Sequence, residues 1–133
     1  MNILLIGNDS STFAALAKRL RQEDHVHLVF SSNGAAGLEH IRQKTEKAID
    51  LVVIDEHLPD MTGIEFVRHL VRIDPLVHTA VIGSLPDLAF HEATEGLGIL
   101  LQLPPQPREQ DAEMLLAVFG KITVLMQPDT AGA

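Results

Sequence analysis

The sequence contains no cysteine, tryptophan or tyrosine, and each absence excludes a class of function. Without cysteine, neither disulfide bonds nor thiolate metal sites can form, and this composition fits a reducing cytoplasm. Without tryptophan and tyrosine, the chain lacks two of the side chains on which nucleic-acid bases stack. The balance of 10 basic against 18 acidic residues gives a net charge of −8, which argues against binding to phosphate backbones. We therefore expect no nucleic-acid binding by this domain.

Long hydrophobic runs are also absent. No apolar stretch reaches the roughly 18 residues that a membrane-spanning helix needs, so we expect no membrane association and a cytoplasmic location. Residues 1–6 lack the basic start of an export signal and predict a first strand instead. A chain of 133 residues has room for one domain. We expect it to span residues 1–126, followed by a small polar tail or the start of a linker at 127–133.

The apolar residues that are present recur in short runs. Runs at 3–6, 51–54, 80–82 and 99–101 predict strands that are buried on both faces of a sheet. Residues 25–30 alternate the apolar Val26, Leu28 and Phe30 with His25, His27 and Val29, which is typical of an edge strand. Between the runs, residues spaced by three and four predict helices, which are expected at 13–20, 34–44, around 66–71, 86–96 and 109–126.

Strand and helix thus alternate five times, which predicts an α/β fold with a doubly wound parallel sheet. In such sheets the functional site lies at the carboxyl ends of the strands. The residues in that place are Gly7, Asn8 and Asp9 after the first strand, Asp55, Glu56 and His57 after the third, Gly83 and Ser84 after the fourth, and Leu103 and Pro104 after the fifth.

The segment 50–63 carries an aspartate at the end of a strand, Asp55, followed by Pro59 and Gly63 at fixed offsets. This segment resembles the phosphoacceptor segment of bacterial two-component response-regulator receiver domains, the CheY-like family. The wider pattern extends over residues 1–126. The resemblance implies a flavodoxin-like fold, with five parallel strands in the order 2-1-3-4-5 and five helices, and a role in phosphorelay signalling without substrate turnover.

The resemblance also assigns roles to residues. Asp55 would accept a phosphoryl group from a histidine kinase or a small donor, and Ser84 would be the hydroxyl that reports phosphorylation. Mg²⁺ would be held by Asp55, by Asn8 and by the backbone carbonyl of His57.

Two parts of the family pattern are missing. The acidic pair that helps to hold the metal falls on Gly7 and Asn8, and the lysine that pairs with the phosphoryl oxygens falls on Leu103. The aromatic residue that usually rotates with the switch is Leu100. We therefore expect weak or absent Mg²⁺ binding and impaired phosphorylation. This is the pattern of a degenerate receiver, or pseudo-receiver, whose output depends on protein contact.

Three alternatives remain open at the sequence level. Asn8, Asp9 or Glu56 could assist metal capture, which would make the chain a working receiver phosphorylated on Asp55. Ser84 could be only a helix cap. Residues 7–10 also resemble the nucleophile turn of small ester hydrolases, but the Asp-x-x-His pair which that family needs near the C-terminus is missing, so a hydrolase is a distant alternative.

The last predicted helix is apolar on more than one side. This excess predicts burial against a partner, through an interface of Leu115, Phe119, Ile122 and Met126. The expected partners are an effector domain or another protein, a histidine kinase upstream, or a second copy that binds through the face of the fourth helix, fifth strand and fifth helix. An overlong closing helix or a linker is the alternative explanation.

Overall fold

The computed structural model describes residues 1–43 and 48–126, with side chains described up to residue 122. Over this part of the chain it shows one sheet of five parallel strands in the order β2-β1-β3-β4-β5, which confirms the predicted fold class and strand order. The strands are β1 (Asn2–Ile6), β2 (His27–Ser31), β3 (Leu51–Asp55), β4 (His78–Ile82) and β5 (Ile99–Leu103). The helices are η1 (Ser10–Phe13), α1 (Ala14–Leu20), α2 (Gly34–Arg42), α3 (Gly63–Ile73), α4 (Asp87–Thr94) and α5 (Glu109–Met126).

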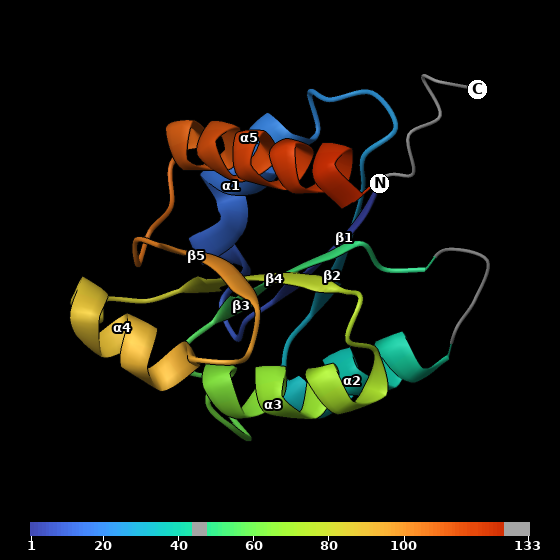
Figure 1. The fold of residues 1–133 in the computed structure, drawn as a ribbon. Helices are drawn as coiled ribbons and strands as arrows, with labels where there is room; N and C mark the ends of the chain where they lie inside the picture. The colour runs from blue at the N-terminus through green and yellow to red at the C-terminus, as the bar shows by residue number, and fades with distance from the viewer. Residues whose placement is uncertain (44–47, 127–133) are drawn as a thin grey trace.

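Helices cover both faces of the sheet (Figure 1), and the sheet divides the core into two halves. Helices α1 and α5 lie together on one face, and α2 and α3 lie on the other (Figure 1). Alternate residues of β1 point to opposite faces, so Ile3 and Leu5 join the α1–α5 half while Leu4 and Ile6 join the α2–α3 half. The continuous apolar runs of β1, β3 and β4 are buried because the sheet is covered on both sides.

The two edge strands depart from their predicted forms. β5 was expected to be buried on both faces, but Ile99, Leu100 and Leu101 are only half-buried because one side of this strand has no neighbouring strand. β2 starts two residues later than predicted, since His25 has a φ of 66°, a left-handed conformation that an extended strand excludes. Its place at the sheet edge is confirmed.

Helix starts follow the expected capping chemistry. Asp9 caps the first helical segment by accepting a hydrogen bond from the Ser11 amide, and the first turn is a 3₁₀-helix. Asn33 and Thr62 cap α2 and α3 in the same way. The α2 helix ends at Arg42, so the predicted extension to Lys44 reaches residues outside the described part of the chain.

The apolar excess of α5 serves the core. Leu115 and Phe119 were predicted to form a partner interface, but they are 0% and 8% exposed and pack in the α1–α5 half. This prediction is wrong because α5 covers both the sheet and α1, and therefore needs a wider apolar face than a helix with one contact. Ile122 is half-buried, and the side chain of Met126 lies outside the described part. Among the described residues, no helix is both long enough and apolar enough to cross a membrane.

Candidate functional site

The carboxyl ends of β1, β3, β4 and β5 meet at one edge of the sheet, because all the strands are parallel. This edge brings together the candidate residues that follow each strand. Asp55 ends β3, is half-buried and accepts a hydrogen bond from the His57 amide at 3.2 Å. Gly7 follows β1 beside it: a Cβ placed on Gly7 would lie 3.6 Å from the Cβ of Asp55.

The loop after Asp55 is fixed by Gly63, the last residue of the predicted motif. The Gly63 amide donates a hydrogen bond to the Glu56 carbonyl at 2.9 Å. A Cβ on Gly63 would lie 2.7 Å from the backbone oxygen of Asp55, so a larger residue would push α3 away from β3. A short bridge between His57 and Thr62 closes the same loop and fixes the backbone of His57, whose side chain is exposed.

A second anchor of this loop was not predicted. The carboxylate of Asp60 accepts hydrogen bonds from the Gly34 amide at 2.8 Å and the Ala35 amide at 2.9 Å, both in the first turn of α2. These two bonds lower the pKa of Asp60 below its ordinary value. Met61 packs against Gly34 beside them. An acidic residue suits a helix N-terminus, but the sequence does not show which helix lies next to it.

The space for an acidic side chain after β1 is occupied by an aromatic ring. Gly7 is buried, and a Cβ on it would lie 2.7 Å and 2.9 Å from two ring carbons of Phe13. Phe13 is 1% exposed and belongs to the core, so its ring has little freedom to move away. The position that the resemblance assigns to a metal-binding carboxylate is therefore closed sterically as well as being uncharged.

The neighbouring residues do not replace the missing carboxylate. Asn8 is exposed and offers only a neutral amide. One carboxylate oxygen of Asp9 accepts hydrogen bonds from the Ser11 hydroxyl at 2.7 Å and from the Ser11 amide at 2.9 Å. These bonds lower the pKa of Asp9 and direct its side chain to the helix start.

The residues present therefore fit a magnesium ion poorly, since Asp55 is the only carboxylate of the three predicted ligands. Across residues 1–43 and 48–126, no group of three histidine or acidic side chains is arranged to hold a metal ion.

Ser84 contacts Glu56 instead of capping a helix. The Ser84 hydroxyl and amide lie 3.5 Å and 3.4 Å from the two oxygens of the Glu56 carboxylate. The N-cap of α4 is Pro86, so the interpretation of Ser84 as only a helix cap is wrong. Glu56 also lies 3.4 Å from the ring nitrogen Nε2 of His57. The sequence had suggested Glu56 only as a helper in metal capture.

The end of β5 presents no counter-charge to Asp55. Leu103, at the position that the resemblance assigns to a lysine, is 1% exposed and lies in the core. Its neighbour Gln102 forms two hydrogen bonds with the backbone of Leu85. Leu100 is half-buried against the same core half as Leu103. The strand therefore ends in apolar and amide side chains.

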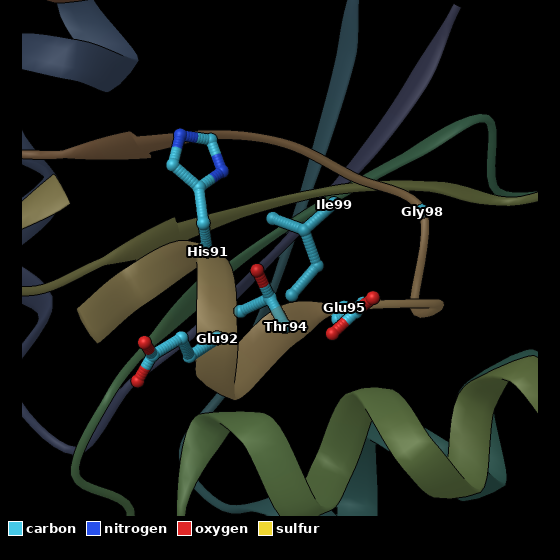
Figure 2. Close-up of a pocket in the computed structure, with 6 residues that line it drawn as sticks. All are labelled: His91, Glu92, Thr94, Glu95, Gly98 and Ile99. Atoms are coloured by element: carbon cyan, nitrogen blue, oxygen red, sulfur yellow. The ribbon is translucent and has the colours of Figure 1, made fainter. Parts of the chain in front are cut away.

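Two surface hollows differ in their position relative to the candidate site: one lies at the carboxyl ends of β1 and β2, and the other lies between α4 and the start of β5. One of 350 Å³ adjoins the site and is lined by Gly7, Asn8, Ser10, Phe13, Phe30, Ser31 and Ser32. Another, of 420 Å³, is shown in Figure 2 and is lined by His91, Glu92, Thr94, Glu95, Gly98 and Ile99. Ile99 begins β5, so the second hollow lies at the amino end of that strand and away from Asp55. It therefore forms no part of the candidate site.

Comparison with known proteins identifies the class. Residues 3–99 match the family model of the response regulator receiver domain, and the chain belongs to this family. It is accordingly a receiver domain of two-component signalling. Domains of this family are in general signalling modules rather than enzymes. They typically bind Mg²⁺ at an acidic pocket and interact with kinases and effector domains.

Solved structures share the fold at low sequence identity. A receiver domain protein from Clostridium thermocellum is 21% identical, with a TM-score of 0.75 over 94% of this chain and 98% of that one. A CheY-like receiver domain protein from Methanospirillum hungatei is 16% identical, with a TM-score of 0.77 over 93% and 97%. The response regulator RcsB of Salmonella typhimurium, studied for its interaction with DNA, is 21% identical, with a TM-score of 0.75 over 91% of this chain and 60% of its own. Among curated proteins, none matches the sequence.

Proposed function

We propose that this receiver domain signals by protein contact and that its output does not depend on ordinary phosphorylation of Asp55. The observation that carries the proposal is the ring of Phe13, which fills the space beside Asp55 where a metal-binding carboxylate would lie. Leu103, which provides no positive charge, supports it. The chain is thus best described as a pseudo-receiver.

The size of the lost interactions supports this proposal. A phosphoryl group carries a charge of roughly −1.5 to −2 near neutral pH and needs positive partners. Removing one preorganised electrostatic contact typically costs on the order of 3–4 kcal/mol of transition-state stabilisation. This site lacks both the acidic residue at Gly7 and the lysine at Leu103. Phosphoryl transfer to Asp55 should therefore be slowed severely.

Intact-mass spectrometry tests the proposal directly. The protein is incubated with acetyl phosphate and Mg²⁺, beside an Asp55→Asn variant and a conventional receiver domain as the positive control. We expect labelling of the control alone. A gain of one phosphoryl group that Asp55→Asn abolishes would instead make the chain a working receiver.

For the contact surface we propose the face formed by α4, β5 and α5. Leu88 on α4 and Met114 on α5 are 73% and 56% exposed. Between Arg72 and Arg108 the sequence has no lysine or arginine, and α4 and its C-cap carry the acids Asp87, Glu92 and Glu95. Exposed apolar side chains with acidic neighbours favour a partner that has apolar side chains flanked by basic ones.

Sedimentation velocity separates a second copy from another partner. Leu88→Asp is compared with Leu76→Asp, since Leu76 is 75% exposed but lies in the connection between α3 and β4. A wild-type dimer that only Leu88→Asp dissociates would make the partner a second copy. Monomers in all three samples would leave an effector domain or kinase as the partner. A dimer weakened equally by both variants would contradict the proposed face.

We further propose that the receiver domain spans residues 1–126 and that 127–133 belong to a tail or to the start of a linker. The absence of cysteine and the role in two-component signalling support a cytoplasmic location.

A further inference from the structure

The loop that joins β4 to α4, residues 83–86, is held by a side chain from β5. The Gln102 amide nitrogen donates a hydrogen bond to the Leu85 carbonyl at 2.8 Å, and the Leu85 amide donates one to the Gln102 oxygen at 3.2 Å. A glutamine amide has both a donor and an acceptor, so it can pair with a backbone residue as a neighbouring strand would. The last backbone hydrogen bond between the two chain segments runs from the Gly83 amide to the Leu103 carbonyl at 2.9 Å. Gln102 thus continues the pairing with β5 two residues further, to Leu85.

The side chain of Glu56, the residue directly after β3, also reaches this loop. The Glu56 carboxylate lies 3.4 Å from the Ser84 amide and 3.5 Å from the Ser84 hydroxyl. Each contact is long, but both involve a charged acceptor, which strengthens a hydrogen bond. The Glu56 side chain is 26% exposed, so its contacts are partly shielded from water.

Gly83 allows both side chains to reach the loop. A Cβ on Gly83 would lie 2.5 Å from a Glu56 carboxylate oxygen and 3.0 Å from the Gln102 side-chain oxygen. Any larger residue would displace these side chains from Ser84 and Leu85. Two side chains from the ends of β3 and β5, the strands on either side of β4, therefore hold the loop, and Gly83 leaves room for both.

The loop determines how the start of α4 is presented. Pro86 caps α4 with a φ of −57° and accepts a hydrogen bond from the Phe90 amide at 2.8 Å. Leu85 and Leu88, on either side of this start, are 37% and 73% exposed. A fixed loop thus fixes the position of these two apolar side chains on the surface.

We propose that Glu56 and Gln102 lock the β4–α4 loop in one conformation, so that the surface around Leu85 and Leu88 is presented without a phosphoryl group on Asp55. The Glu56 carboxylate gives the Ser84 hydroxyl an anionic acceptor from within the chain. This inference rests on the proposed function, in which the output is independent of phosphorylation.

Amide hydrogen exchange measured by NMR on the full chain tests the lock. Gln102→Ala removes both bonds to Leu85, and Gln102→Glu keeps the size of the side chain but removes its donor. Gln110→Ala, on an exposed position of α5, is the matched control. We expect the Leu85 amide to exchange roughly tenfold faster in Gln102→Ala, with no change in the control. Unchanged exchange and unchanged Leu85 and Leu88 methyl shifts in both Gln102 variants would overturn the lock.

Variants of Glu56 test the contacts of its carboxylate with Ser84. Glu56→Ala should speed exchange at the Ser84 amide several-fold, whereas Glu56→Gln, which keeps an oxygen acceptor, should have a smaller effect. Equal exchange rates in wild type and Glu56→Ala would remove Glu56 from the lock.

Adding acetyl phosphate and Mg²⁺ to the wild-type sample tests the proposed function separately. Shifts of loop resonances after this addition would show a phosphorylation-dependent loop and contradict both proposals. The Gln102 result without phosphodonor bears on the lock alone.

Discussion

At the scale of single residues, Gly7 and Phe13 decide what the site can bind. The Phe13 ring would lie 2.7 Å from a Cβ on Gly7, and it is held there by the core. An acidic residue introduced at position 7 would therefore clash with the Phe13 ring, whether or not its carboxylate could bind a metal ion. The missing charge and the packing of Phe13 therefore both oppose metal binding at this position.

We predict that Gly7→Asp destabilises the fold by about 1–3 kcal/mol, the usual cost of overpacking a core. Phe13→Ala alone should cost about 3–5 kcal/mol through the cavity that it leaves. The double variant should cost less than the sum of the two, because the aspartate enters the space that the ring vacates. Urea unfolding of the four proteins measures this coupling, and strictly additive costs would show that the two side chains do not compete for space.

Gly63 offers a sharper test of the loop after Asp55. We predict that Gly63→Ala destabilises the protein by about 1–3 kcal/mol, since its Cβ would lie 2.7 Å from the Asp55 backbone oxygen. Gly120→Ala is the matched control, because a Cβ there meets nothing within 4 Å and alanine is favoured in a helix by about 0.5–1 kcal/mol. Thermal unfolding should shift in opposite directions for the two variants. A Gly63→Ala protein as stable as wild type would mean that the loop can move away freely.

At the scale of elements, helix starts and side-chain anchors connect parts that are distant in sequence. Asp60 joins the loop after β3 to the first turn of α2, and the two amides that it binds belong to residues 34 and 35. The sequence predicts that α2 exists and that a carboxylate suits a helix start, but it does not predict this pairing. The pairing of Gln102 with Leu85 was also unpredictable, because the two residues are 17 positions apart and no sequence pattern links them.

The Asp60 anchor predicts a pH dependence. Because folding lowers the pKa of Asp60, its contribution to stability is present above the unfolded pKa of about 3.9 and is lost as the pH falls through the lower folded value. Asp60→Asn should therefore reduce stability at neutral pH and lose less stability than wild type on acidification. Urea titrations between neutral and acidic pH measure both effects, with Asp24→Asn at an exposed position as the control. Parallel pH curves for Asp60→Asn and wild type would contradict the anchor.

The α5 helix gives a contrast between neighbouring residues. Leu115 is 0% exposed and Met114 is 56% exposed. We predict that Leu115→Ala costs about 2–5 kcal/mol, whereas Met114→Ala stays within about 0.5 kcal/mol of wild type. Chemical denaturation checks both values. Similar small effects would restore the prediction that Leu115 belongs to a partner interface rather than to the core.

At the scale of the whole molecule, the fold was predictable because it depends on patterns that are local in the sequence. Apolar runs fixed the central strands, and the spacing of Asp55, Pro59 and Gly63 indicated the family. The interpretation of α5 failed because apolar content does not reveal whether a second helix, here α1, covers it. The sequence predicted that the site lacks an acidic residue at Gly7 and a lysine at Leu103. It did not predict that Phe13 fills the space beside Gly7, because this contact joins residues that the sequence pattern does not pair.

The same architecture predicts how the intact protein responds to metal. A ligand that binds only the folded state at ten times its dissociation constant stabilises that state by about 1.4 kcal/mol, which corresponds to a few degrees in melting temperature. Because Gly7 places no carboxylate beside Asp55 after β1, we expect equal melting temperatures for the wild-type protein in excess Mg²⁺, about ten times a millimolar dissociation constant, and in chelator. The Gly7→Asp/Phe13→Ala variant is the informative comparison, since it offers the missing carboxylate and the space for it. A melting temperature that rises with Mg²⁺ in this variant alone would show that the ring of Phe13 closes the site. A rise in the wild-type protein would show that Asn8 and Asp55 suffice to bind the ion, and the pseudo-receiver proposal would then lose its main support.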